Sequence, residues 1–227
     1  DAIRPDVALN YSTVAGSDVY LAESNVITIG TVGSVDANRV QADASTVVIG
    51  DAADLVGIDA PGSLASLSAG GAITVADPIT LDDLLLHTSA GDVTLIALVT
   101  AVDTVEIDTA GAVIDGNGDA TNVITDSLTV AAVNGIGSGD ALETVISTLN
   151  ATNTTSGNIE LINEGALNIT GVINSGPGSI NLINNGAVAV NGDVTGGGLI
   201  GMNINGGLTI DAVMTAESNV TLTVNET

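Results

Sequence analysis

Apolar residues recur at a nearly constant step in the C-terminal half of the chain. The segment "GNIELINEGALNI" (157–169) returns as "GSINLINNGAVAV" (178–190) and, more loosely, as "GLIGMNINGGLTI" (198–210). Aligning the copies gives two apolar columns whose members recur at a step of 20 or 21 along the sequence: Ile159, Ile180, Ile200 and Val220, then Leu161, Leu182, Met202 and Leu222. A fixed period of this length indicates a repeat protein.

The first half of the chain carries the same rhythm. Apolar pairs that recur at a step of 20 are Val7 and Leu9, Ile27 and Ile29, Val47 and Ile49, and, after one longer step, Ile73 and Val75, Val93 and Leu95. A companion column consists of Leu64, Leu85 and Val105, each followed six places later by a glycine. We therefore expect a single repeat domain that covers residues 1–227.

Within each unit, apolar and polar residues alternate, as in Ile73-Thr74-Val75 and Leu208-Thr209-Ile210. Such alternation is typical of strands with one buried face. A unit of about 20 residues is too short for a βαβ crossover, so it can bury that face only by stacking on its neighbours. The pattern predicts an all-β protein, a single-stranded parallel β-helix (β-solenoid) of about 11 coils, each one repeat long and spaced by ~4.8 Å. A leucine-rich repeat shares the period, but no sustained L-x-x-L-x-L pattern is present.

One stretch near residues 135–150 interrupts the rhythm. Leu142, Val145, Ile146 and Leu149 fall at helical spacing, and Asp140 with Glu143 has the form of a capping box. We expect a short helix or an irregular coil from about Asp140 to Ser147. The alternative is that Leu149 belongs to a further strand, since the step from Leu128 to Leu167 is 39, close to two coils.

Composition restricts the core and the partners. Only 1% of the residues are aromatic, so the core must be aliphatic, and 28 glycines suit tight turns between short strands. The formal net charge of −25 disfavours nucleic acid and anionic lipid as partners and favours cations and basic proteins. No apolar run approaches the roughly 18 residues of a membrane helix. The chain begins with Asp and lacks a basic leader, from which we expect a processed chain or a part of a longer one.

The run "NGIGSGDALETVISTLNATNTTSGNIELINEGALNITG" (134–171) resembles the repeats of very large secreted bacterial surface proteins of the filamentous haemagglutinin type. The order of GIGSGDALET and SGNIELINEGALNI carries the resemblance, which extends over about residues 105–190. It implies a right-handed parallel β-helix, export to the cell surface, and a role as an adhesin shaft or extracellular fibre. Neither an RGD tripeptide nor a two-partner-secretion signature accompanies it, so the chain is expected to be shaft rather than tip.

The sequence offers little for catalysis. Enzymes built on β-helices need a base beside a carboxylate cluster that holds calcium. The basic side chains are Arg4, Arg39 and His87, each in a different predicted coil. We therefore predict that the protein is not an enzyme and requires no cofactor. His87 is expected to face solvent or a neighbouring side chain rather than a metal.

Acidic ladders are the sharpest candidate site. A step of 20 or 21 stacks Asp82 or Asp83 against Asp103, and Asp119 against Asp140. Carboxylates about 5 Å apart repel one another unless a cation intervenes, and Ca²⁺ with six to eight oxygen ligands suits them. The alternative is that these turns direct their charges into water. "GNGDATNV" and "GIGSGDAL" match a calcium-binding nonapeptide repeat only in part.

Two further features bear on function. Val7-Ala8-Leu9 and Val220 to Val224 keep the strand pattern, so open edges are expected to self-associate end to end. An outward threonine column, Thr28, Thr74, Thr94, Thr129 and Thr209, belongs to the alternative of an isolated module that binds sugar, ice or a basic partner. Threonine is also an ordinary outer-face strand residue. The favoured prediction is a structural shaft of an extracellular bacterial surface fibre.

Overall fold

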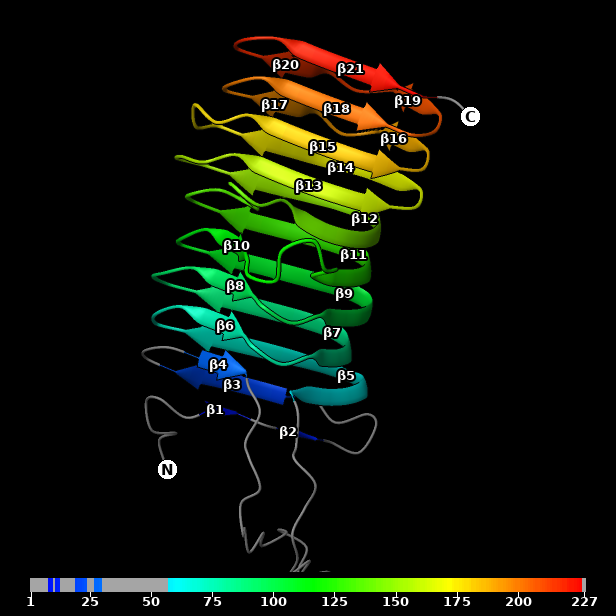
Figure 1. Ribbon diagram of the computed structural model, residues 1–227. Coiled ribbons are helices and arrows are strands. Elements are labelled where there is room, and N and C mark those ends of the chain that lie inside the picture. Colours follow the sequence, from blue (N-terminus) through cyan, green and yellow to red (C-terminus); the bar gives the residue numbers. More distant parts are fainter. Residues whose placement is uncertain (1–7, 10, 13–18, 24–26, 30–56, 226–227) are drawn as a thin grey trace, which may run out of the picture.

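The computed structural model describes residues 8–9, 11–12, 19–23, 27–29 and 57–225. The described residues contain strands and no helix, and all the strand pairs are parallel. Figure 1 shows the strands stacked in layers, from blue N-terminal coils to red C-terminal coils. The chain is therefore a parallel β-solenoid, which confirms the predicted fold.

The strands follow one another with no helix between them in the described segments. The first ten are β1 (Ala8–Leu9), β2 (Tyr11–Ser12), β3 (Val19–Glu23), β4 (Ile27–Ile29), β5 (Ile58–Ala69), β6 (Ile73–Val75), β7 (Ile79–Thr88), β8 (Val93–Leu95), β9 (Val99–Thr109) and β10 (Val113–Asp115). The others are β11 (Val123–Ala132), β12 (Leu142–Asn153), β13 (Ile159–Glu164), β14 (Leu167–Asn174), β15 (Ile180–Asn185), β16 (Val188–Val190), β17 (Val194–Gly196), β18 (Ile200–Ile204), β19 (Leu208–Ile210), β20 (Met214–Ala216) and β21 (Val220–Val224).

Two sheets form the walls of the solenoid. One has the order β1-β4-β6-β8-β10, and the other contains the path β2-β5-β7-β9-β11-β12-β13-β15-β18-β21. In the C-terminal coils β14 pairs with β12 on one edge, and on its other edge its first half pairs with β16 and its second half with β17, which continue to β19 and β20. About eight coils lie in residues 57–225, compared with the 11 expected for the whole chain.

The register of the C-terminal coils follows the predicted columns. Ile159 pairs with Ile180, Ile180 with Ile200, and Ile200 with Val220. Because each coil puts the same kind of residue at the same place, the interior is a continuous stack of Val, Ile, Leu and Ala side chains, with Met202 the only buried methionine of the described coils. The outer positions of the same strands are polar or partly exposed.

Buried asparagines join neighbouring coils by side-chain hydrogen bonds. The Nδ2 group of Asn163 donates to Asn184 Oδ1 at 2.9 Å, and that of Asn153 donates to Asn174 Oδ1 at 2.9 Å. All four side chains are fully buried. Buried amides are tolerated only when their donors and acceptors are satisfied, so these asparagine ladders tie each coil to the next in a fixed register.

In the first half the columns of Ile27, Ile73 and Val93 and of Ile29, Val75 and Leu95 are confirmed, but the companion column is wrong by one residue. Leu84 lies between Ala65 and Val105, and all three are buried, whereas the expected column held Leu64 and Leu85. The cause is a β-bulge, because the register shifts between Leu81 and Asp83. A bulge adds one residue to a strand and moves the following side chains to the opposite face.

A second difference concerns the predicted coil at residues 47–49. Strand β4 pairs directly with β6, with Ile27 opposite Ile73 and Ile29 opposite Val75. A strand edge has room for one neighbour, so no coil lies between these two strands. Residues 47–49 are outside the described segments.

The predicted helix at Asp140–Ser147 is not present. Leu142–Asn153 is strand β12, in register with β11 on one side. Along β12 the buried positions change parity after Ile146, so that Leu142 and Leu149 are both buried although they differ by an odd number of positions. Such a shift within a strand produces helix-like spacing in the sequence. The irregular part of this coil lies just before β12, over residues 133–141, where Ile136 makes isolated bridges to Val113 and Ile159.

In the described part of the chain, no helix offers the length and apolarity of a membrane span.

Trimming a core side chain tests the stacked interior. Ile107 is buried between Leu86 and Val130 of the adjacent coils. We expect Ile107→Val to lower the free energy of unfolding by about 0.5–1.5 kcal/mol, the usual cost of one core methylene. Chemical denaturation measures the change, with Val102→Ala, 63% exposed on the same strand, as the control. Equal losses in the two variants would contradict the register of β9.

Candidate functional site

Two successive coils carry loops at adjacent places on the wall. Val93 and Val99 are six positions apart, whereas their partners Val113 and Val123 are ten apart, so the first loop contains inserted residues. In the next coil Ile136 and Leu142 are again six apart, while in the coil after it Ile159 and Leu161 are only two apart. We call the two loops, 116–122 and 137–141, the acidic loop pair. Figure 1 shows the first of them as a green trace that leaves the wall after β10.

Asp115 and Asn122 hold the base of the acidic loop pair. Asp115 ends β10 and is 8% exposed, and Asn122 is fully buried. Asp115 Oδ1 accepts hydrogen bonds from Asn117 N at 2.9 Å and from Asn122 Nδ2 at 2.7 Å. Asn122 also joins the two coils, because its Oδ1 accepts from Glu143 N at 2.8 Å. The first loop is thereby fixed against the beginning of β12.

Four carboxyl groups gather around this base. Asp140 lies close enough to Asp115 and Asp119 for the charges of both to act on it. Desolvation raises the pKa of Asp140 above its ordinary value, and the charge of Asp115 raises it further. The pKa of Glu143 is raised by the same two causes in the same order.

Some of these oxygen atoms have no hydrogen-bond donor. Asp115 Oδ2 and Glu143 Oε2 are buried and unpartnered. Among the described residues the one basic side chain is His87, whose Nδ1 lies 3.1 Å from Asp108 Oδ2. The acidic loop pair therefore has no positive side chain of the described coils to balance it.

The structure separates the five aspartates that were predicted to hold calcium. Asp119 and Asp140 are brought close together, although they lie in loops and not in a strand ladder. Asp83 pairs with Thr104 rather than with Asp103, and Asp82 lies in the bulge, where its Oδ1 accepts from Gly62 N at 2.9 Å. Over the described segments, no three His, Cys, Asp or Glu side chains are grouped as a metal site on their own. Calcium binding by Asp82, Asp83 and Asp103 stays a prediction.

Three members of the predicted threonine column are stacked. Thr28, Thr74 and Thr94 are in register on β4, β6 and β8, and Ile114 follows them on β10. Thr129 and Thr209 belong to the other sheet, in β11 and β19. The described column is therefore three threonines long.

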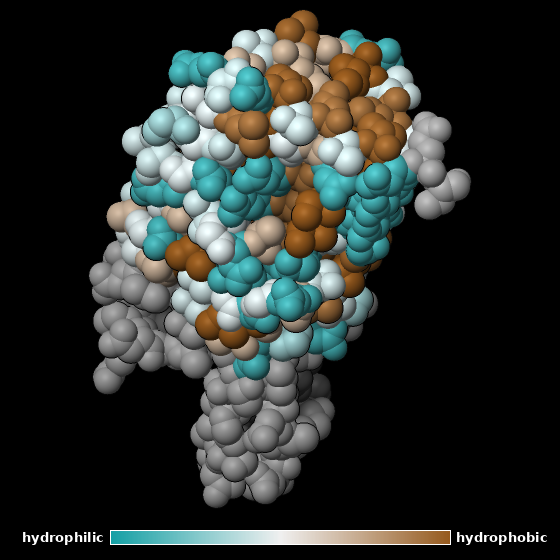
Figure 2. All heavy atoms as spheres, turned by 45° about the horizontal axis from the view of Figure 1, so that its top comes forward, coloured by the Kyte–Doolittle hydropathy of each residue, from teal (hydrophilic) through white to brown (hydrophobic). Residues whose placement is uncertain are grey.

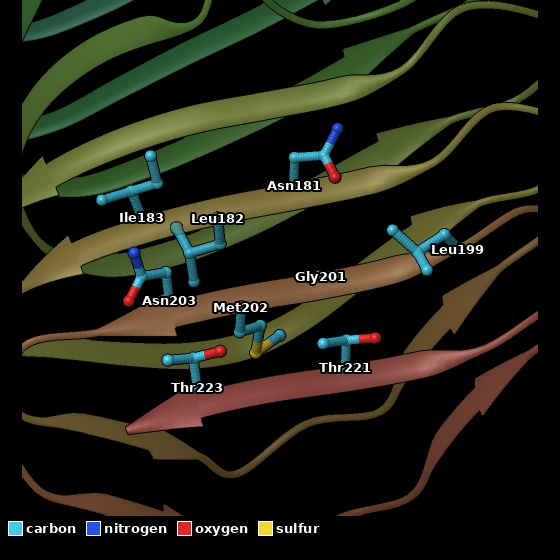
Figure 3. Close-up of a pocket in the computed structure, with 9 residues that line it drawn as sticks. All are labelled: Asn181, Leu182, Ile183, Leu199, Gly201, Met202, Asn203, Thr221 and Thr223. Carbon is cyan, nitrogen blue, oxygen red and sulfur yellow. The ribbon is translucent and has the colours of Figure 1, made fainter. Parts of the chain in front are cut away.

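A shallow hollow lies on the outer face of the C-terminal coils. Asn181, Gly201 and Thr221 are in register on β15, β18 and β21, and the missing side chain of Gly201 leaves the space (Figure 3). Ile183, Leu199 and Asn203 also line it. None of its lining residues is charged or aromatic, so the hollow offers only amide, hydroxyl and aliphatic contacts.

The last described strand exposes apolar side chains. Val220, Leu222 and Val224 of β21 are 42%, 38% and 40% exposed, while their register partners on β18 are buried. Figure 2 shows brown, apolar side chains gathered toward this end of the molecule. These side chains are in register with interior positions of β18.

No known family model, curated protein or solved structure matches the chain.

Proposed function

We propose that this chain is a shaft element of an extracellular bacterial surface fibre or adhesin. The supporting observation is that one sheet of parallel strand pairs joins the described coils continuously from β2 to β21, and that the asparagine ladders reinforce it between β12 and β14 and between β13 and β15. Such a stack bears load along its axis, because each coil is held to the next by many hydrogen bonds. The proposed task is mechanical and not catalytic.

Sequence features support an extracellular location. Residues 134–171 resemble filamentous haemagglutinin-type repeats, and the chain has no cysteine and only two residues that trypsin recognises, Arg4 and Arg39. The acidic surface keeps neighbouring shafts apart unless cations bridge them. These properties suit a protein that is exposed outside the cell.

We further propose that the open edge at β21 stacks on another coil, end to end. Val220, Leu222 and Val224 would be buried by one more coil, as Ile200, Met202 and Ile204 already are. In a sample of the isolated 227-residue protein that coil has to come from a second copy. An exposed parallel strand also offers its unpaired main-chain groups for such pairing.

Electron microscopy tests the shaft role. We expect axially continuous rods that lengthen with protein concentration. The competing function is an isolated binding module whose ligand occupies the hollow over Gly201. Monodisperse single particles, together with saturable binding of a sugar or basic peptide that Gly201→Asn abolishes, would favour this module and contradict the shaft.

A charge at the open edge should block stacking. Leu222→Asp places a carboxylate at an interior position of the proposed junction, where an unpaired buried charge costs about 3–5 kcal/mol. We expect the association constant to fall by well over tenfold, since about 1.4 kcal/mol is tenfold. Light scattering after size-exclusion chromatography measures it. Thr221→Asp adds the same charge to the outer face of β21 and should assemble like the original protein; equal assembly of both variants would refute the end-to-end junction.

A further inference from the structure

We propose that the acidic loop pair binds one calcium ion, with Asp115 and Asp140 as its carboxylate ligands. The site joins two successive coils, since Asp115 ends β10 and Asp140 precedes β12. This inference is independent of the shaft role, because a calcium site would stabilise the fold of a shaft or of a binding module equally.

The first observation is an acceptor that nothing satisfies. Asp115 is more than nine-tenths buried, and its Oδ2 has no hydrogen-bond donor. The neighbouring side chain is the carboxyl group of Asp140, which also supplies only an acceptor when it is ionised. Two neighbouring carboxylates without a donor between them repel each other, and a cation bound to both reverses the sign of the interaction.

The second observation is the amide of Asn117, which meets a like group at close range in either orientation. With its nitrogen toward the loop, it donates to Asp115 Oδ1 at 2.6 Å, Ala120 O at 2.9 Å and Gly118 O at 3.1 Å. The Nδ2 donor of Asn122 then lies 2.9 Å from another donor. Asn122 cannot turn to avoid this contact without losing the bond from Glu143 N to its Oδ1.

With its oxygen toward the loop, Asn117 accepts from Asn122, but it then faces the same three oxygen atoms. A bound cation resolves this conflict, because the oxygen atoms become a common ligand set. Carboxylate, amide and main-chain oxygens are the mixture that Ca²⁺ takes, six to eight at a time.

The spacing of the first loop supports the same ion. Asp115, Asn117 and Asp119 match the beginning of the calcium-loop pattern D-x-[DN]-x-[DN], whose alternate residues turn their oxygens toward one point. The chain departs from that pattern at Ala120, where the pattern has glycine, and at Asp126, where it has glutamate. Asp140, from the next coil, supplies the further carboxylate. Asp119 and Glu143 add negative charge around the site.

Isothermal titration of the chelator-treated 227-residue protein with CaCl₂ tests the proposal. We expect one saturable site per chain with a Kd on the order of 10⁻⁴ to 10⁻³ M, as in extracellular calcium modules. Asp140→Asn should weaken binding at least tenfold, roughly the least that metal sites lose when a supporting group is removed. Asp211→Asn removes the same charge from an exposed position in a distant coil and should bind like the original protein. Mg²⁺ should compete poorly, because it demands a stricter octahedral geometry.

Thermal melting separates a ligand from a merely structural residue. Asp140→Asn should melt at or above the original protein in chelator, since a repulsion is removed, and should lose the increase in Tm that Ca²⁺ gives the original protein. Absence of saturable binding, or equal calcium affinity of Asp140→Asn and Asp211→Asn, would overturn the proposal. Equal competition by Mg²⁺ would overturn the choice of calcium.

Discussion

Asn163→Asp is expected to destabilise the C-terminal coils strongly at neutral pH. Asn163 is fully buried, and its Nδ2 donates to Asn184 Oδ1 at 2.9 Å and to Ile146 O at 3.3 Å. A carboxylate puts an oxygen in place of that donor, so it faces two acceptors and carries an uncompensated buried charge. Such a charge costs about 3–5 kcal/mol, a large part of the roughly 5–15 kcal/mol that stabilises a typical domain.

The pH dependence of the loss identifies its cause. Burial and the facing acceptors raise the pKa of the new carboxyl group in the folded state, so the penalty is absent below the unfolded pKa of about 3.9 and grows as the pH rises above it. Denaturation followed by circular dichroism at pH 7 and pH 3.5 measures the change. Asn203→Asp adds the same charge to the exposed face of β18 and should change the unfolding free energy little at either pH. A loss of equal size in both variants would show that charge alone, and not the ladder, is responsible.

The sequence was sufficient to predict the register where the repeat is regular. Ile159, Ile180 and Ile200 pair as expected because a parallel stack keeps one residue type in one column, and each unit has nearly the same length. The asparagine ladders were not predicted from the sequence, although the sequence contains a signal for them. Asn163 and Asn184 occupy the same place in "LINE" and "LINN", where a strictly alternating pattern would put an apolar residue.

The companion column of the first half could not be aligned from pattern alone, although Ile73 and Val93 pair as expected. Leu84, Leu85 and Leu86 are consecutive, so either parity gives a continuous apolar column, and only the bulge after Leu81 determines that Leu84 and Leu86 are the buried ones. The same ambiguity produced the false helix at Asp140–Ser147, since a parity shift in a strand and a helical turn both space apolar residues by three or four. Strand pairing across coils, which local sequence does not encode, decides both cases.

Only part of the acidic loop pair was predicted from the sequence. The step of 21 from Asp119 to Asp140 brought these two together in the prediction, but it gave no role to Asp115, Asn117 or Asn122. The available signal was the length of the connection. Ten positions separate the strand starts on either side of the first loop, while six separate the corresponding starts in the preceding coil. The extra residues have to leave the wall, and Asp119 lies on the loop that they form.

Gly178→Ala tests whether the repeat glycines limit how closely the coils approach. Gly178 begins its repeat directly above Gly157, and a Cβ atom at this position would overlap the main-chain carbonyl of Gly157. That carbonyl accepts hydrogen bonds from Asn153 Nδ2 at 3.2 Å and from Asn174 Nδ2 at 3.1 Å, so it cannot move without disturbing an asparagine ladder. Overpacking costs about 1–3 kcal/mol and each weakened hydrogen bond about 1 kcal/mol more, so we expect a total loss of about 3 kcal/mol or more.

Gly207→Ala is the matched control, because no heavy atom lies within 4 Å of the Cβ position there. The same chemical change should leave the unfolding midpoint in urea nearly unaltered at Gly207 and lower it strongly at Gly178. A small change at both positions would mean that neighbouring coils can separate locally to admit a methyl group. In that case the close stacking at Gly178 would result from the small size of glycine without requiring it, and another residue at Gly178 would preserve the solenoid.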